Sequence, residues 1–165
     1  MRSQAEQTVI LGSSGSHGSK PPARTPMPAR LGRYELTHEL GKGAMGVVYQ
    51  GRDPRINREV AVKAISLADE FDPEDLERVR TRFFREAEMA GRLSHPHIVT
   101  IYDAGEDRGT AYIAMELLRG QHLVEYTSAA RLLPTAIAIE IVARLADALH
   151  YAHQNQVVHR DIKPA

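Results

Sequence analysis

Short segments rich in β-branched and aromatic residues recur between residues 34 and 115. Tyr34, Leu36 and Leu40 fall on alternate positions, which is the period of a strand with one buried face. Four more segments share this strand preference before residue 116. They are Val47–Asp53, Val60–Lys63, Val99–Tyr102 and Thr110–Met115. The pattern therefore predicts five strands.

A helical period replaces this pattern in the middle of the chain. Apolar residues recur at steps of three and four over residues 76–90, which predicts one apolar helix face. Asp72 can cap the start of this helix, and Pro73 suits its first position. We expect the helix to run from there to about Arg92.

A second long helix is expected from Thr135 to about Gln154, after a short helical stretch near residues 123–130. Its apolar positions again share one face, and they are Ile137, Ile141, Leu145, Leu149 and Ala152. A run of strands with one helix, followed by further helices, indicates an α+β fold.

Residues 1–33 are rich in Ser, Gly and Pro and bury too little apolar area to offset the entropy of ordering. We predict a disordered arm there and one folded domain over residues 34–165. The arm carries five basic residues and one acidic residue, a net charge of +4, and the remaining 16 basic and 20 acidic residues give −4. Scattered cations without aromatic residues indicate a solvated tail, so we expect no nucleic-acid partner.

The chain of 165 residues contains no cysteine, which excludes a disulfide framework and a thiolate metal site. No apolar run approaches the roughly 20 residues that span a bilayer. We therefore expect a cytoplasmic chain without a membrane segment, since reduced compartments rarely use disulfides.

The most informative polar segment is a glycine loop. Gly41, Gly43 and Gly46 form the pattern G-x-G-x-x-G, which occurs in two kinds of nucleotide-binding fold. In a dinucleotide-binding oxidoreductase the last glycine opens a helix. Here strand-forming residues 47–49 follow, and the turn residue Asp53 ends the strand. The loop is therefore expected in a β-hairpin, and an oxidoreductase is disfavoured.

Two further motifs follow the glycine loop. Residues 60–63 read V-A-V-K, and residues 159–165 read H-R-D-I-K-P-A. Together the three motifs resemble the eukaryotic-type (Hanks-type) protein kinases. The loop letters G-A-M-G and the H-P-H-I-V at residues 95–99 are most similar to the bacterial serine/threonine branch. The resemblance ends inside the catalytic loop, so we expect an N-terminal fragment of such a kinase.

The resemblance implies a small lobe over residues 34–117, with a five-stranded antiparallel sheet and one helix, and a truncated large lobe over residues 118–165. It implies phosphoryl transfer from ATP, with Mg²⁺, to Ser or Thr of protein substrates. The family's Mg²⁺ ligands would lie beyond Ala165, so the chain alone is expected to be inactive. A kinase–kinase dimer and a downstream membrane anchor are features that a full-length parent would add.

By the same resemblance, ATP would bind through the glycine loop, the two facing strands and the linker between the lobes. The expected residues are Leu40, Gly41, Lys42, Gly43, Ala44, Met45, Gly46, Val48, Ala61, Lys63, Met115, Glu116 and Leu118. Val48 and Ala61 would sandwich the adenine, although ordinary strand packing explains them equally. The main chain of Glu116 and Leu118 would bond the adenine edge, next to Met115 as gatekeeper.

Four residues are expected to carry the chemistry. A lysine at the end of an apolar strand needs a partner, and the resemblance gives Lys63 the phosphates and a helix carboxylate. By position that carboxylate is Glu86, with Glu88 as the competitor. Asp161 would accept the proton of the substrate hydroxyl, and Lys163 would neutralise the transferring phosphate.

Other functions remain open for the residues alone. Small-molecule phosphotransferases of related fold usually lack the Lys163–Pro164 pair. A truncated nucleotide-binding or protein-interaction module is a non-enzymatic alternative. His150 and His153, with His159 nearby, lack a completing carboxylate or cysteine ligand, so no metal site is predicted.

Overall fold

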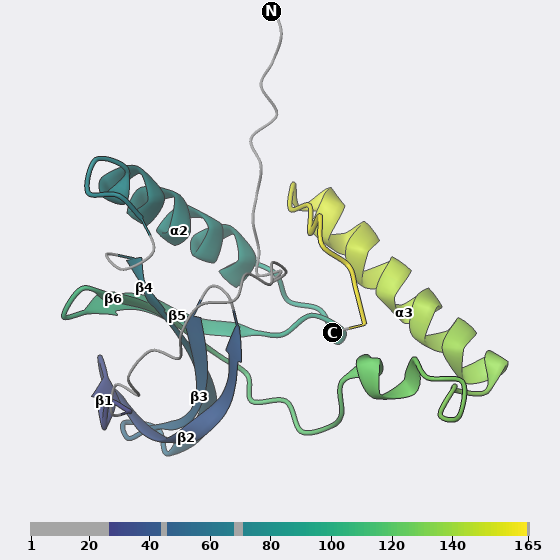
Figure 1. Cartoon of the computed structure of the whole chain (residues 1–165). Coiled ribbons are helices and arrows are strands. Elements are labelled where there is room, and N and C mark those ends of the chain that lie inside the picture. Colours follow the sequence, from purple (N-terminus) through teal and green to yellow (C-terminus); the bar gives the residue numbers. More distant parts are fainter. Residues whose placement is uncertain (1–26, 44–45, 68–70, 165) are drawn as a thin grey trace, which may run out of the picture.

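The computed structural model describes residues 27–43, 46–67 and 71–164. Its main element is an antiparallel six-stranded sheet with the strand order β1-β2-β3-β4-β6-β5. The strands are β1 (Arg30–Leu31), β2 (Tyr34–Gly43), β3 (Gly46–Asp53), β4 (Arg58–Ser66), β5 (Ile101–Asp107) and β6 (Thr110–Met115). The helices are α2 (Leu76–Gly91), the 3-10 helix η1 (Leu123–Tyr126) and α3 (Thr135–Gln154). In Figure 1, α2 lies against the sheet and α3 lies to one side, beside the C-terminal segment.

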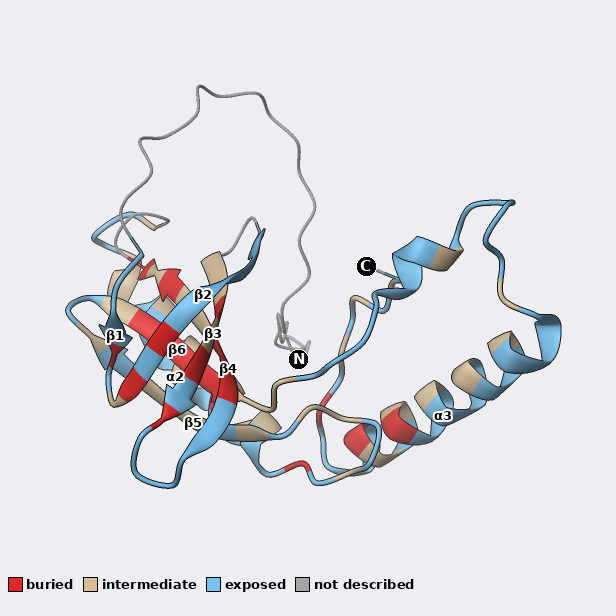
Figure 2. Ribbon diagram, turned by 90° about the horizontal axis from the view of Figure 1, so that it is seen from below, coloured by how far each residue is buried: buried red, intermediate tan, exposed pale blue. Residues whose placement is uncertain are grey.

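One face of the curled sheet encloses the main core. Successive side chains of a strand point to opposite faces, so Val60 and Val62 of β4 face this core while Ala61 and Lys63 face the other side. The core consists of Leu31, Tyr34, Leu36, Tyr49, Val60, Val62, Tyr112 and Ala114. Figure 2 shows these buried positions as red bands across the strands.

The strands differ from their predicted bounds where pairing to a neighbour extends them. β4 continues past Lys63 to Ser66, because Ile65 and Ser66 still pair with β6. Lys63 therefore lies inside a strand, and the expectation that it ends the strand is wrong. β5 begins at Ile101 and extends to Asp107, whereas the apolar pattern predicted residues 99–102. Polar residues join β5 because β6 supplies the hydrogen-bonding partners.

Helix α2 begins later than its sequence predicts. Asp75 is the N-cap residue and makes no side-chain capping bond. The backbone carbonyl of Asp72, the expected cap, accepts a hydrogen bond from the Asp75 backbone N–H at 2.9 Å, within a turn that precedes the helix. The helix then packs on the second face of the sheet, where Leu76, Val79 and Phe83 contact Ile65, Leu67 and Ala111.

The N-terminal boundary of the fold also differs from the expectation. Arg30 and Leu31, placed in the arm by composition, form strand β1 and pair with Glu35 and Tyr34 of β2. The sheet therefore has six strands, where five were predicted. The part of the arm expectation that concerns residues 1–26 lies outside the described residues.

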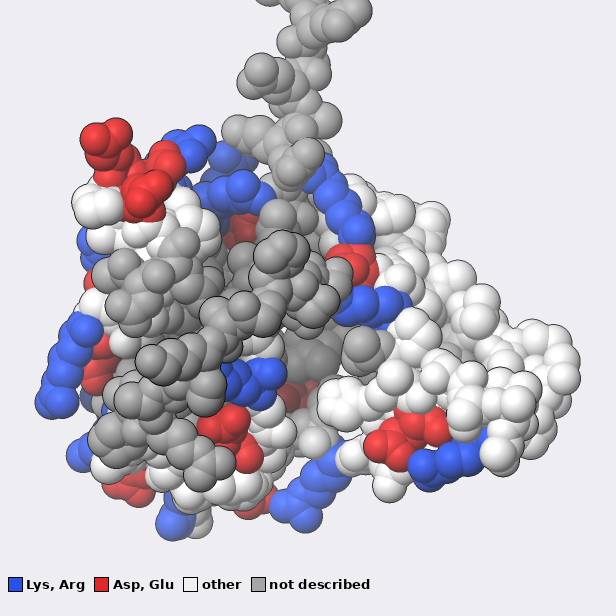
Figure 3. Space-filling model, viewed as in Figure 1, with Lys and Arg blue, Asp and Glu red and all other residues white. Residues whose placement is uncertain are grey.

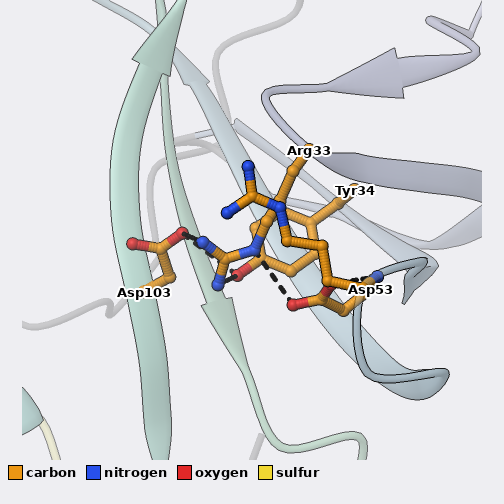
Figure 4. Close-up of polar contacts among 5 residues, drawn as sticks. Arg33, Tyr34, Asp53 and Asp103 are labelled. Atoms are coloured by element: carbon orange, nitrogen blue, oxygen red, sulfur yellow. Dashed lines mark hydrogen bonds and ion pairs between the residues drawn. The ribbon is translucent and has the colours of Figure 1, made fainter.

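An ion-pair network fixes this boundary (Figure 4). The Arg33 guanidinium pairs with Asp53 through Nε at 2.9 Å and with Asp103 at 3.1 Å, and the Tyr34 hydroxyl donates to Asp103 at 3.1 Å. Burial raises the pKa of Tyr34, and the Asp103 carboxylate raises it further. Burial alone would also raise the pKa of Asp53, but the Arg55 backbone N–H and the Arg33 guanidinium outweigh it and lower that pKa.

Helix α3 contacts the rest of the fold through the loop that follows α2. Leu93, Ala152 and Val157 form a separate apolar cluster. The His95 ring stacks on Tyr151 with its centroid 5.2 Å away, and His95 Nε2 lies 3.2 Å from the Asp147 carboxylate. Among the described residues, no helix combines the length and the apolarity that crossing a bilayer requires.

Candidate active site

The glycine loop forms the β2–β3 hairpin that the sequence predicts. Gly43 pairs with Gly46 next to the tip, and Gly41 pairs with Val48 two residue pairs further back. Leu40 and Lys42 are exposed along the same strand. Ala44 and Met45, the two remaining loop residues of the prediction, lie outside the described residues.

Two glycines of this hairpin are needed for different reasons. Gly46 has a φ of +119°, and a Cβ there would lie 2.1 Å from the Ala64 carbonyl oxygen, so the fold itself requires glycine. A Cβ at Gly41 would meet no atom of the described residues within 4 Å. The space beside Gly41 is therefore open to a ligand, and a side chain there would obstruct only that ligand.

The predicted site residues on β3, β4 and β6 share one face of the sheet. Val48 lies opposite Lys63, and Ala61 lies opposite Met115. Since residues opposite each other in an antiparallel pair point to the same side, all four side chains project from the face that α2 also covers. Lys63 lies between Ala61 and Ile65 on that face, and Ile65 contacts α2. Lys63 is thus placed between the candidate adenine surface and the helix.

Helix α2 turns Glu86 and Glu88 in different directions. The Glu86 side chain is 17% exposed, whereas that of Glu88 is 64% exposed. Glu86 follows Phe83 by three residues and so lies near the helix face that packs on the sheet. The Glu86 carboxylate is held by its own helix, with Arg82 Nε 2.9 Å from Oε1. Pairing of Lys63 with Glu86 stays a prediction.

The segment after β6 has one backbone group already engaged. The Glu116 N–H donates to the Thr100 carbonyl at 2.9 Å, next to the half-buried Met115. The group that Glu116 can offer to a ligand edge is therefore its carbonyl oxygen. Leu118 follows, and this residue is 64% exposed.

The loop after α3 brings Asp161 and Lys163 together. Lys163 Nζ lies 2.9 Å from Asp161 Oδ2, and the Asp161 N–H donates to His159 Nδ1 at 3.2 Å. Arg160, between His159 and Asp161, has a φ of +64°, a conformation that a non-glycine residue keeps only where its surroundings hold it. Pro164 accepts a hydrogen bond from the Val124 N–H at 2.8 Å, which ties this loop to η1.

Comparison with known proteins identifies this arrangement. A family model described as the protein kinase domain matches residues 34–165. The chain belongs to the protein kinase family. Among curated kinases it is 45% identical over 134 residues to the serine/threonine-protein kinase PrkC of Bacillus subtilis, covering 81% of this chain and 20% of PrkC. It is 42% identical over 145 residues to PknB of Mycobacterium leprae, covering 86% of this chain and 23% of PknB.

Solved kinase structures show the same fold. The crystal structure of the Mycobacterium tuberculosis PknI kinase domain superposes with a TM-score of 0.69 at 39% identity, over 82% of this chain and 54% of that one. The predicted α+β fold, a kinase small lobe followed by the first helices of the large lobe, is confirmed. The chain spans about a fifth of the curated kinases and about half of the solved one.

Kinases of this family generally use ATP with Mg²⁺, and the described residues do not provide a set of ligands for the metal. No group of three or more His, Cys, Asp or Glu side chains that could hold a metal occurs in the described parts of the chain. In the described segment after α3, residues 155–164, Asp161 is the one carboxylate, and Lys163 pairs with it. Mg²⁺ favours several oxygen ligands in octahedral geometry, which this pair does not supply.

Two features of this kinase site were not predicted. The first is the ion pair between Arg82 and the candidate glutamate, Glu86. Arg82 lies four residues before Glu86, which is the spacing of a helical ion pair, so the sequence already contained the signal for this contact. The second is the hydrogen bond between Thr100 and Glu116, which lie just before β5 and just after β6, so only the pairing of these two strands brings them together.

Proposed function

We propose that this chain provides the ATP-binding lobe and the catalytic loop of a protein serine/threonine kinase. The observation that carries the proposal is the shared sheet face of Val48, Ala61 and Lys63, with the open backbone of Gly41 beside it. An apolar surface next to an ammonium and exposed glycine backbone suits a nucleotide, which has a flat apolar base and an anionic tail.

In this proposal the nucleotide is held from three sides. Val48 and Ala61 contact the adenine, and the Glu116 carbonyl accepts a hydrogen bond from its amino group. Backbone N–H groups at Gly41 and Gly43 approach the phosphates without side-chain obstruction. Lys63, oriented by the carboxylate of Glu86, neutralises the phosphate oxygens.

The transfer step then belongs to the catalytic loop. The substrate Ser or Thr oxygen forms a bond to the γ-phosphorus while the bond from that phosphorus to the β–γ bridging oxygen breaks. ADP leaves with the bonding electron pair, and the hydroxyl proton passes to the Asp161 carboxylate. Lys163, which lies 2.9 Å from Asp161, is placed to offset the charge of the transferring group.

The proposal extends to the setting of the reaction. ATP and protein hydroxyl groups are its substrates, and Mg²⁺ supplies charge neutralisation when it is bound. A cytoplasmic location fits a chain without cysteine. A dimer of two kinase copies is a further proposal that rests on the resemblance alone.

The test is transfer of radiolabelled phosphate from ATP to a general protein substrate by the complete gene product that contains these residues. We expect transfer to fall at least about a thousandfold in Lys63→Met and in Asp161→Asn, since each removes a group that acts on the reacting phosphate. Lys20→Met is the matched control, because it makes the same replacement in the arm. Transfer that survives Lys63→Met would refute the assignment, and ATP binding without any transfer would favour the binding-module alternative.

A further inference from the structure

The Glu86 carboxylate is positioned by a residue outside the expected kinase set. Arg82 lies one helical turn before Glu86 on α2, and its Nε is 2.9 Å from Glu86 Oε1. The Arg82 side chain is 48% exposed, whereas the Glu86 side chain is 17% exposed. Arg82 therefore reaches from the solvent side of α2 toward the carboxylate on its inner side.

This ion pair differs from a pair between Glu86 and Lys63 in one physical respect. Arg82 and Glu86 belong to the same helix, so their distance stays fixed when α2 shifts as a body. Lys63 belongs to β4, and its distance to Glu86 depends on how closely α2 approaches the sheet. Separating the Glu86 carboxylate from Lys63 also costs less electrostatic free energy when the carboxylate is bound to Arg82, because it keeps a cationic partner.

We propose that Arg82 is a positioning residue that competes with Lys63 for the carboxylate of Glu86. The inference rests on the proposed function, since the pairing of Lys63 with Glu86 is part of it. Arg82 stabilises α2 arrangements in which Glu86 is turned away from Lys63, and so it shifts the equilibrium between the two partners of Glu86. Replacing Arg82 removes this competitor of Lys63.

A second arginine of α2 has an ion pair with another carboxylate and provides a control. Arg78 pairs with Asp75 at 2.7 Å at the solvent-exposed start of the helix. Arg78→Leu removes the same charge and the same kind of local pair as Arg82→Leu. Any effect of a lost arginine on helix stability is therefore common to both variants, whereas an effect on Glu86 is specific to Arg82.

The lysine content of the chain makes the competition measurable in solution. The chain has four lysines, Lys20, Lys42, Lys63 and Lys163, so ¹³C-labelled lysine gives four side-chain signals that Lys→Arg variants assign. The pKa of Lys63 reports its share of Glu86, because an adjacent carboxylate stabilises the ammonium form. We expect Arg82→Leu to raise the Lys63 pKa by about 0.5 unit, a value reduced for partial solvent exposure. Arg78→Leu should leave it unchanged.

A second pair of variants separates competition from direct charge repulsion. Removing a nearby cation raises the pKa of Lys63 by itself, and this part survives in the Glu86→Gln background. Competition requires that the rise in the Lys63 pKa be smaller in the Glu86→Gln background than in the parent chain, as a double-mutant cycle measures. Arg82→Lys keeps a cation at the same helical spacing, so we expect it to restore most of the original Lys63 pKa.

The possible results distinguish this inference from the proposed function. A rise that is equal with and without Glu86 would overturn the role of Arg82. The role of Arg82 is also overturned if Arg82→Leu leaves the Lys63 pKa unchanged while Glu86→Gln lowers it. In that case the Lys63–Glu86 pair is supported. If Glu86→Gln changes nothing in either background, the pair itself is wrong and both proposals lose their basis. Circular dichroism of each variant checks that α2 remains folded.

Discussion

The small-lobe sheet and helix α3 bury their apolar residues to very different extents. Tyr34, Val62 and Ala114 in the sheet have no exposed surface. In α3 only the small side chains of Ala148 and Ala152 are buried, while Ile139 and Val142 are 64% and 63% exposed. Figure 2 shows the same contrast between the red strands and the mostly blue and tan helix. The sheet closes its own core, whereas α3 carries apolar surface that the described residues do not cover.

The two long helices also differ in how many charged residues they carry. Seven of the 16 residues of α2 are charged, against three of the 20 residues of α3. In Figure 3 the surface over α3 is largely white, and charged side chains cluster around α2. A charged outer face belongs to a helix packed on one side, while an apolar surface on several sides suits a helix with several neighbours. Helix α2 therefore packs mainly on the sheet, with Met89 also contacting the cluster of Leu93, Ala152 and Val157, whereas α3 keeps apolar surface that the described residues do not cover.

The largest difference in stability between the two regions is expected when a side chain is removed from the sheet core. Tyr34→Ala should destabilise the fold by about 3–5 kcal/mol, because it leaves a cavity against Tyr112 and removes the hydroxyl bond to Asp103. Ile139→Ala in α3 should change stability by less than about 0.5 kcal/mol. Urea unfolding followed by fluorescence or circular dichroism measures both. Equal losses would mean that α3 is as tightly packed as the sheet.

Backbone packing at the start of the sheet provides a second test. Gly32 has a φ of +55°, and a Cβ there would lie 2.3 Å from the Tyr112 hydroxyl oxygen. Gly32→Ala should cost about 2–4 kcal/mol, the sum of a left-handed alanine and an overlap in the core. Gly109→Ala is the matched control, since its φ is +78° but no atom in the described parts of the chain lies within 4 Å of the added Cβ, so only about 1–2 kcal/mol is expected. Thermal unfolding of both variants compares the two costs.

The Arg33 network should make the small lobe sensitive to acid. The folded-state pKa of Asp53 is lower than its ordinary value of 3.8. The carboxylate therefore contributes stability that is complete above that value and is lost as the pH falls through the lower folded-state pKa. In Asp53→Asn the unfolding free energy should be lower at pH 7 and should fall less steeply below pH 4. An unchanged pH dependence would contradict the role of this ion pair.

The smallest effect on stability is expected on the exposed face of α3. Replacing Ile139 and Val142 together by Lys should leave the unfolding midpoint nearly unchanged, because both side chains are already largely in water. Binding of the dye ANS should nevertheless fall, since the dye reports accessible apolar surface. A large loss of stability instead would show that these residues are buried in solution by another contact.

Local patterns in the sequence were sufficient for several elements and insufficient for others. The bounds of α3 and β6 were predicted correctly, since a helical period marks α3, and β6 is a short apolar run that follows the turn residues 105–109. The hairpin around the glycine loop also follows from residues 46–53 alone. The start of α2 was wrong because Asp72 and Pro73 favour a turn as well as a helix. Strand β1 was missed because two residues carry no detectable period.

The sequence by itself determined the family, the order of the elements and the residue types of the candidate site. These features depend on local spacing, such as the three glycines, the V-A-V-K strand and the H-R-D-x-K-P loop. Only the tertiary structure decided which residues meet across strands and helices. Pairing register placed Lys63 opposite Val48, and packing of α2 turned Glu86 inward and Glu88 outward. Contacts between distant segments depend on the packing of the whole domain, so no local pattern encodes them.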